Sequence, residues 1–90
     1  MIIEYSGQFK KDVKKVRKRE KDLGKFKEVT VKLSNQENLP PKFKDHKLSG
    51  PWENYRECHI KPDLLLIYRI INESDTLSLA RLGSHSDLFE

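Results

Sequence analysis

One apolar run limits the folds open to this 90-residue chain more than any other feature. Residues 64–71 read Leu-Leu-Leu-Ile-Tyr-Arg-Ile-Ile, with no polar alternation that would mark a solvated face. Such a run is typical of a central strand that is buried on both sides. The flanking segments, residues 61–63 and 72–75, have the composition of turns. The run therefore predicts the middle of a small sheet.

Two helices are predicted near the N-terminus, after a short strand at residues 2–5. Ser6 is a suitable N-cap for the first helix, and Asp22 is a suitable cap for the second. Apolar residues recur at helical spacing in both segments, and the prolines within residues 38–41 end the second helix. We expect the two helices to form a hairpin.

The remaining segments complete an α+β domain. Residues 55–60 and 76–82 alternate as strands do, whereas residues 40–53 have the composition of a loop or a single helical turn that contains His46. The order β-α-α-β-β-β predicts one domain over residues 1–90, with the helix hairpin on one face of a small, mainly antiparallel sheet.

Strand alternation predicts where the polar residues of the second predicted strand lie. Glu57 and His59 share one face, and Cys58 and Ile60 share the other. If Cys58 and Ile60 face the helices, Glu57 and His59 face the open side of the sheet.

The same alternation makes a prediction for the last strand. Arg81 has the parity of Leu77 and Leu79, and His85 follows on that face if the strand continues. We therefore expect the C-terminal end of this strand to deliver Arg81 and His85 together.

Positive charge is concentrated in the first helix. Residues 10–21 hold eight basic and two acidic side chains, a local net charge of +6 in a chain whose total is +4. The block is either a solvated helical face or a surface for phosphate or an acidic partner. Its members on the polar faces of the helix are Lys10, Lys11, Lys14, Lys15, Lys18 and Arg19.

Several classes of protein are excluded by composition. No run approaches the ~18 apolar residues that a membrane span needs, so we expect a soluble protein. The start of the chain lacks the pattern of a secretory signal, and the single Cys58 cannot form an internal disulfide. These features favour the cytoplasm, and no cofactor is expected.

Three histidines, His46, His59 and His85, carry the most informative chemistry. Imidazole both gives and takes protons near neutrality, and metal-free RNA cleavage needs a base, an acid and a cation. Two histidines with Asp63 and Arg81 supply that set. Each residue also has a structural interpretation, as a capping group or in an ion pair. Zinc binding is the competing use of the histidines, but their spacing is not that of a zinc motif.

Four segments together resemble the YafQ-type toxins of the RelE/ParE superfamily, and the resemblance spans essentially the whole chain. Asp-His-x-Leu-x-Gly begins at Asp45, His-x-x-Pro-Asp begins at His59, and Arg-x-Gly-Ser-His-x-x-Leu-Phe begins at Arg81. The fourth segment, residues 5–12, reads Tyr-Ser-Gly-Gln-Phe-Lys-Lys-Asp. These motifs in this order are far more specific than any one histidine.

The resemblance implies a RelE-like fold and the toxin of a bacterial type II toxin–antitoxin system. It implies an endoribonuclease that enters the ribosomal A site, cuts mRNA there and is held inactive by a DinJ-type antitoxin. The family's functional positions fall on His46, His59, Asp63, Arg81, His85 and Phe89, with Glu57 where relatives have an acidic residue.

Within that resemblance we assign His46 as the base and His85 as the acid, although the two roles are open to exchange. Arg81 and His59 are expected at the phosphorane, and Asp63 is expected to orient a histidine. The residues expected to contact RNA are Glu57, Phe89, Lys10, Lys11, Lys14 and Lys15.

One residue departs from some relatives, which carry Trp where this chain has Leu64. Stacking on a base is therefore in doubt at that point. The superfamily also includes gyrase-inhibiting toxins, so a non-catalytic module that binds RNA or protein is the alternative function.

Overall fold

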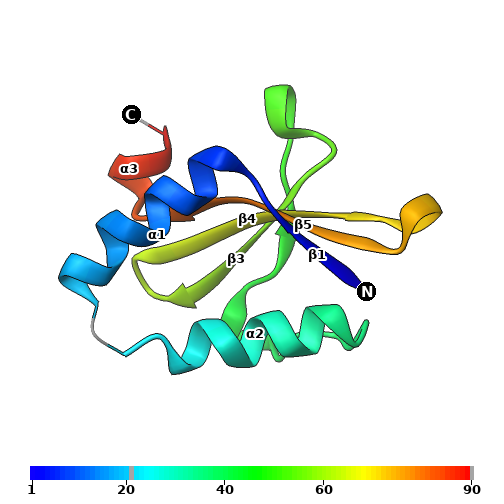
Figure 1. Cartoon of the computed structure of the whole chain (residues 1–90), viewed down its shortest axis with the longest axis horizontal. Coiled ribbons are helices and arrows are strands. Elements are labelled where there is room, and N and C mark those ends of the chain that lie inside the picture. Colours follow the sequence, from blue (N-terminus) through cyan, green and yellow to red (C-terminus); the bar gives the residue numbers. More distant parts are fainter. Residues whose placement is uncertain (21, 90) are drawn as a thin grey trace.

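A five-stranded sheet forms the middle of the molecule in the computed structural model, which describes residues 1–20 and 22–89 (Figure 1). The strand order is β1-β5-β4-β3-β2, with β1 parallel to β5 and the other neighbours antiparallel. None of the described helices has the length and apolar character needed to cross a membrane. In chain order the helices and strands are β1 (Ile2–Tyr5), α1 (Gly7–Arg19), α2 (Gly24–Ser34), the 3-10 turn η1 (Pro41–Phe43), β2 (His46–Lys47), η2 (Gly50–Trp52), β3 (Arg56–Lys61), β4 (Leu64–Ile71), η3 (Asn72–Ser74), β5 (Thr76–Gly83) and α3 (His85–Phe89).

The apolar run forms β4, the central strand. It pairs with β3 on one side and β5 on the other, and Leu65, Leu66 and Ile67 are fully buried. Both faces of β4 are covered because α1 and α2 pack on one and α3 with the segment before β3 packs on the other. The predicted α+β order and the central position of this strand are confirmed.

The larger core lies between the helices and the sheet. α1 packs along β5 and α2 packs against β3, with the rings of Phe9 and Phe26 stacked at 6.0 Å between centroids. Cys58 and Ile60 belong to this core, so the predicted division of β3 into two faces is confirmed. The predicted placement of both helices on one face is also confirmed.

The helix ends follow the sequence in part. Ser6 caps α1 by accepting a hydrogen bond from a backbone N–H in the first turn, as predicted. Asp22 accepts from the N–H of Gly24 at 2.8 Å and so assists the start of α2. α2 ends at Ser34, before the prolines, because Gln36 adopts a left-handed conformation (φ 59°) that closes the last turn.

The prediction that His46 lies in a loop or a helical turn is wrong. His46 lies in β2 and pairs with Glu57 of β3. The preceding residue, Asp45, accepts hydrogen bonds from Arg56 at 3.1 and 3.3 Å and from the Tyr68 hydroxyl at 2.5 Å. This anchor holds the segment against the sheet, and composition alone does not reveal it.

The predicted face of Arg81 is also wrong. The pairing of β5 with β4 skips Ala80, so a bulge separates Leu79 from Arg81. Beyond the bulge Leu82, rather than Arg81, continues the helix-facing row of Leu77 and Leu79. A one-residue shift exchanges the two faces of a strand, which explains the error.

The face of the sheet away from α1 and α2 is not open, because a second, smaller core covers part of it. Its buried members are Leu65, Ile67 and Leu88 of α3. The rings of Trp52 and Tyr55 meet edge to face at 5.2 Å and pack beside this core. Glu57 and His59 therefore lie at the margin of a covered surface.

Candidate active site

The three histidines converge, an arrangement that the sequence allows but does not require. His59 of β3 is the shared neighbour, with ring centroids 6.4 Å from His46 of β2 and 6.1 Å from His85 of α3. The ring of Phe89 lies 6.0 Å beyond His85. We call His46, His59 and His85 the histidine row.

A buried carboxylate links two members of the row. Oε1 of Glu57 lies 3.5 Å from Nε2 of His46 and 3.6 Å from Nε2 of His59. Glu57 is 4% exposed, and burial of a carboxylate is costly unless hydrogen bonds or charges compensate it. Glu57 is placed to accept a hydrogen bond from either nitrogen when that nitrogen carries a proton.

The tautomer of His46 is fixed by its backbone neighbour. Nδ1 of His46 lies 2.7 Å from the carbonyl oxygen of Lys44, and a carbonyl only accepts hydrogen bonds. Nδ1 therefore carries a proton, and in the neutral ring Nε2 has a free lone pair. With its side chain 49% exposed, His46 is able to take a proton from a bound substrate.

Asp63 lies beside His85, which brings the β3–β4 turn next to the C-terminal segment. The backbone N–H of His85 donates to Oδ1 of Asp63 at 3.3 Å, and Nδ1 of His85 lies 3.8 Å from the same oxygen. The two side chains are 62% and 72% exposed. Asp63 is thus placed to orient His85 at the open end of the row.

α3, which carries His85 and Phe89, was not predicted. Ser84 and Asp87 form a capping box, because each side chain accepts from the other's backbone N–H. The spacing Ser84-x-x-Asp87 was the sequence signal that could have revealed this helix.

Asp87 also ties α3 to α1. Its carboxylate lies 2.9 Å from Nζ of Lys15 and 2.7 Å from a guanidinium nitrogen of Arg19. Hydrogen bonds from Lys15 and Arg19 hold the pKa of Asp87 well below its ordinary value. The position of His85 therefore depends on contacts with a helix some 70 residues earlier in the chain, at separations of 72 and 68 residues.

Arg81 is engaged by α1. Its Nε and Nη2 donate to the carboxylate of Asp12 at 2.8 and 3.3 Å, and the N–H of Leu82 donates to the same group at 3.0 Å. Burial opposes ionisation of Asp12, but the hydrogen bonds from Arg81, Leu82 and Gln8 outweigh it and lower the pKa of Asp12. The structure thus places Arg81 in an ion pair with a helix, whereas His85 contacts Asp63.

Two apolar positions near the site differ in what they offer a base. Phe89 is 44% exposed, so its ring is available for stacking. Leu64, at the position where some relatives carry Trp, is 4% exposed and belongs to the helix-side core. An aromatic contact with RNA is therefore available at Phe89.

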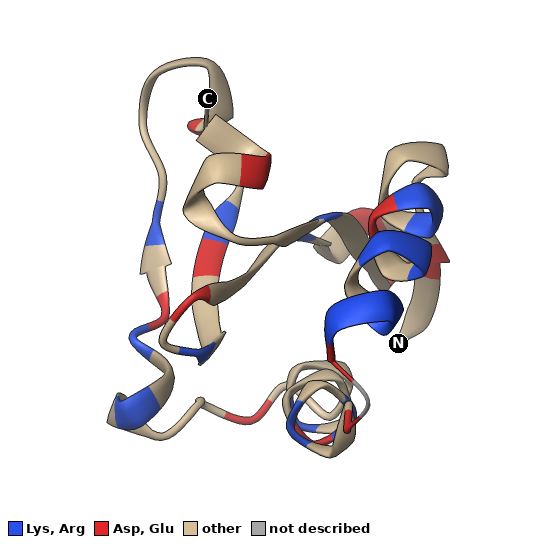
Figure 2. Cartoon of the chain, turned by 90° about the vertical axis from the view of Figure 1, so that its left-hand side faces the viewer, with Lys and Arg blue, Asp and Glu red and all other residues tan. Residues whose placement is uncertain are grey.

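The basic residues of α1 lie on its exposed surface, as predicted (Figure 2). Lys15 and Arg19 are occupied in part by Asp87. Within the described residues, the other basic side chains of the helix form no ion pair; they are Lys10, Lys11, Lys14, Arg17 and Lys18.

Within the described residues, neither a reactive cysteine nor a metal-binding cluster accompanies the histidine row. Burial raises the pKa of the Cys58 thiol to about 12, and Asp45 and Glu57 add to the effect, so this cysteine is not a nucleophile. Among residues 1–20 and 22–89, no three His, Cys, Asp or Glu side chains are grouped closely enough to hold a metal ion.

The whole chain, residues 1–90, matches a family described as the bacterial toxin of type II toxin-antitoxin system, YafQ. It is 46% identical over 88 residues to the mRNA interferase toxin YafQ of Escherichia coli strain K12, covering 97% of this chain and 94% of that protein. The class of protein is therefore the toxin of a type II toxin–antitoxin system. The chain belongs to the YafQ family, and the predicted resemblance is confirmed.

Solved structures of relatives have the same fold. A metal-bound toxin from Helicobacter pylori is 48% identical and superposes with a TM-score of 0.92 over 99% of both chains. YafQ in the Escherichia coli DinJ-YafQ complex is 45% identical, with a TM-score of 0.87 over 98% of this chain and 97% of that one.

Proposed function

We propose that this toxin is an mRNA interferase, an endoribonuclease that cuts mRNA in the ribosomal A site by metal-independent general acid–base catalysis. The endoribonuclease class follows from the 46% identity to a relative of that name. The single observation that supports the mechanism is the histidine row, with Glu57 3.5 and 3.6 Å from two of its members.

His46 acts as the base. Its Nε2 takes the proton of the RNA 2′-hydroxyl, the 2′-oxygen attacks the adjacent phosphorus, and Glu57 then accepts a hydrogen bond from the new Nε2–H. The Nδ1–H of His46, 2.7 Å from the Lys44 carbonyl, leaves Nε2 as the nitrogen that exchanges a proton with the substrate.

His85 acts as the acid. Its proton passes to the 5′-oxygen as the phosphorus–oxygen bond breaks, which leaves a 2′,3′-cyclic phosphate on one product and a 5′-hydroxyl on the other. Asp63 orients the ring from 3.8 Å, and the exposure of His85 gives the leaving nucleoside room.

His59 and Arg81 stabilise the negative charge that develops on the phosphorane. His59 is the shared neighbour of the base and the acid, which supports a position for it beside the phosphate. Asp12 holds Nε and Nη2 of Arg81, which fixes the orientation of the guanidinium group. Phe89 stacks on a base next to the cut bond.

The ribosome and an antitoxin are the proposed macromolecular partners. The exposed basic residues of α1 contact ribosomal RNA, where Lys and Arg side chains neutralise backbone phosphates. A DinJ-type antitoxin inhibits the toxin, as suggested by the complex of the Escherichia coli relative with DinJ. The toxin acts in the cytoplasm, where ribosomes are available.

The test is the substitution His85→Ala, with Ser86→Ala as the control from the same helix. We expect cleavage of ribosome-bound mRNA to fall at least ~100-fold in His85→Ala, as loss of a proton-transfer group predicts. Thermal melting by circular dichroism should be nearly unchanged, because the His85 side chain is 62% exposed. Cleavage within about threefold of the Ser86→Ala control would refute the catalytic role of His85.

A further inference from the structure

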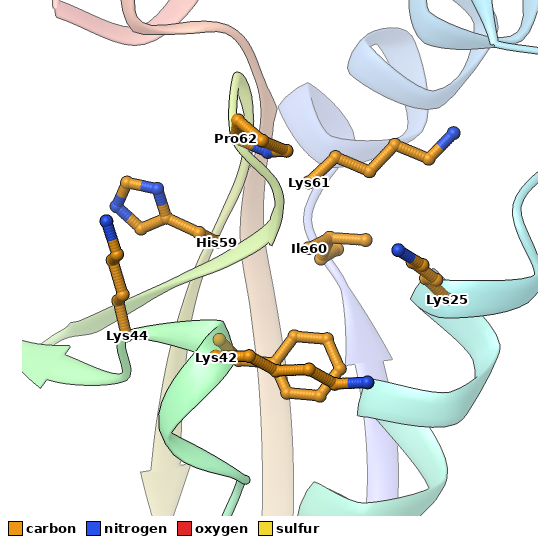
Figure 3. A pocket seen from close by; sticks show the side chains of 8 residues that line it. Lys25, Lys42, Lys44, His59, Ile60, Lys61 and Pro62 are labelled. Carbon is orange, nitrogen blue, oxygen red and sulfur yellow. The ribbon is translucent and has the colours of Figure 1, made fainter.

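A hollow with basic walls adjoins the histidine row. It has a volume of about 250 Å³ and lies between α2, η1 and the end of β3 (Figure 3). This is smaller than the ~300–1,000 Å³ typical of a pocket for a whole drug-sized ligand, so it fits a single small group. Its lining includes His59 and four lysines, namely Lys25, Lys42, Lys44 and Lys61.

The floor of the hollow is rigid and apolar. Phe43 and Ile60 are 2% and 3% exposed and belong to the helix-side core. Nζ of Lys42 lies 5.1 Å from the centroid of the Phe43 ring, so its stem crosses this floor. The Lys42 side chain therefore lies against a surface of the packed core.

The charge of the hollow is largely uncompensated. Lys61 pairs with Glu20 at 2.9 Å, and in Figure 3 its side chain extends away from His59. Of the described residues, no acidic side chain forms an ion pair with Lys25, Lys42 or Lys44. Uncompensated amines around a small hollow favour an anion.

Lys44 fixes this hollow relative to the catalytic base. Its backbone is in the left-handed conformation (φ 49°), its N–H donates to Pro41 and its carbonyl accepts from Nδ1 of His46. Figure 3 shows its amine rising beside the ring of His59. An anion bound by Lys44 is therefore held at a fixed position relative to His46 and His59.

We propose that the hollow binds one phosphate of the substrate mRNA, next to the phosphate that the histidine row attacks. This inference rests on the proposed nuclease function and adds a subsite to it. A phosphate of the same strand is favoured over an acidic peptide because His59 lines both the hollow and the active site. Lys44 supplies the contact beside His59, whereas the Lys42 amine lies on the opposite side of the hollow, towards Lys25 of α2 (Figure 3).

The test combines a protein variant with a neutral phosphate. Lys42→Gln/Lys44→Gln removes two amines from exposed side chains and keeps the Lys44 carbonyl that positions His46. Lys27→Gln/Lys32→Gln removes the same charge from α2 outside the hollow. Ribosomes are programmed with mRNAs that each carry one methylphosphonate, an uncharged linkage, at a position flanking the cut bond.

We expect the hollow variant to raise the toxin concentration for half-maximal cleavage roughly tenfold, as loss of charge-assisted hydrogen bonds predicts, and the control variant to match the wild type. At one position the methylphosphonate should raise the concentration of wild-type toxin needed for half-maximal cleavage by a similar factor. There the hollow variant should show no further loss, because the contact is already absent.

Three results would overturn the proposal. If the variant and every methylphosphonate reduced cleavage independently, the hollow would not contact an mRNA phosphate, and ribosomal RNA would be its ligand instead. Weaker binding of the antitoxin with unchanged cleavage would assign the hollow to an acidic protein segment. Absence of any cleavage by the wild type would instead refute the nuclease function itself, on which the subsite depends.

Discussion

Asp87 is predicted to control the position of His85, the proposed catalytic acid, without touching RNA. Asp87→Ala removes the ion pairs with Lys15 and Arg19 and the hydrogen bond to the N–H of Ser84. The partner side chains are 63% and 49% exposed, so each ion pair contributes only about 0.2–1 kcal/mol. The cap adds ~1 kcal/mol, for a total of about 2 kcal/mol, or roughly a 30-fold increase in the opening of α3.

Hydrogen exchange measures this opening directly. The N–H of Leu88 donates to the carbonyl of Ser84 within α3, and the fully buried Leu66 in β4 reports on global unfolding. We expect Asp87→Ala to lower the protection of Leu88 roughly 30-fold and that of Leu66 by less. Asp87→Asn keeps an acceptor for the cap and should lower it only about fivefold.

Acid provides an independent check of the same contact. A lowered folded-state pKa means that the Asp87 carboxylate stabilises α3 above its ordinary pKa, near 4, and that this contribution is lost as pH falls towards the lowered pKa. Protection of Leu88, corrected for intrinsic exchange, should therefore fall with acid in the wild type but not in Asp87→Asn. Asp75→Asn, an exposed carboxylate at a left-handed position, is the control. Unchanged Leu88 protection in Asp87→Ala would refute the reasoning.

Three other outcomes are expected. In Gly83→Ala the added Cβ would lie 2.9 Å from both Cβ and Oδ2 of Asp87, so α3 must shift and cleavage should fall while the chain stays folded by circular dichroism. Lys10→Glu/Lys14→Glu should weaken ribosome binding and reduce its log–log salt slope by about 0.7–0.9 per lost phosphate contact; an unchanged slope would return this face to a solvated role. Cleavage by EDTA-treated toxin added to intact ribosomes should persist; because a Helicobacter pylori relative is metal-bound, stoichiometric metal whose removal abolishes cutting would reassign the histidines as ligands.

The elements that follow from local periodicity could be predicted from the order of the residues alone. The run at residues 64–71 specified a strand buried on both faces, because neither of its faces is polar. Alternation along β3 correctly separated Glu57 and His59 from Cys58 and Ile60. These features depend on residues close together in the chain, so the pattern of side chains carries the information.

The catalytic candidates were also found from the sequence, although their arrangement was not. The motifs around His46, His59 and His85 identified the family, and the β-meander allowed but did not require their convergence. The contact between His85 and Asp63 spans 22 residues, and no local periodicity determines such a distance.

Features that depend on partners distant in the chain became visible only in the folded protein. Arg81 lies on the face opposite to the predicted one because of the bulge at Ala80. Its guanidinium group is bound by Asp12, which is 69 residues away in the chain. β2 formed because Asp45 is held by Arg56 and Tyr68, which are 11 and 23 residues away. Such pairings form when packing of the whole domain brings charged groups together and removes them from water. Their energies are properties of the folded chain, which is why local sequence patterns do not reveal them.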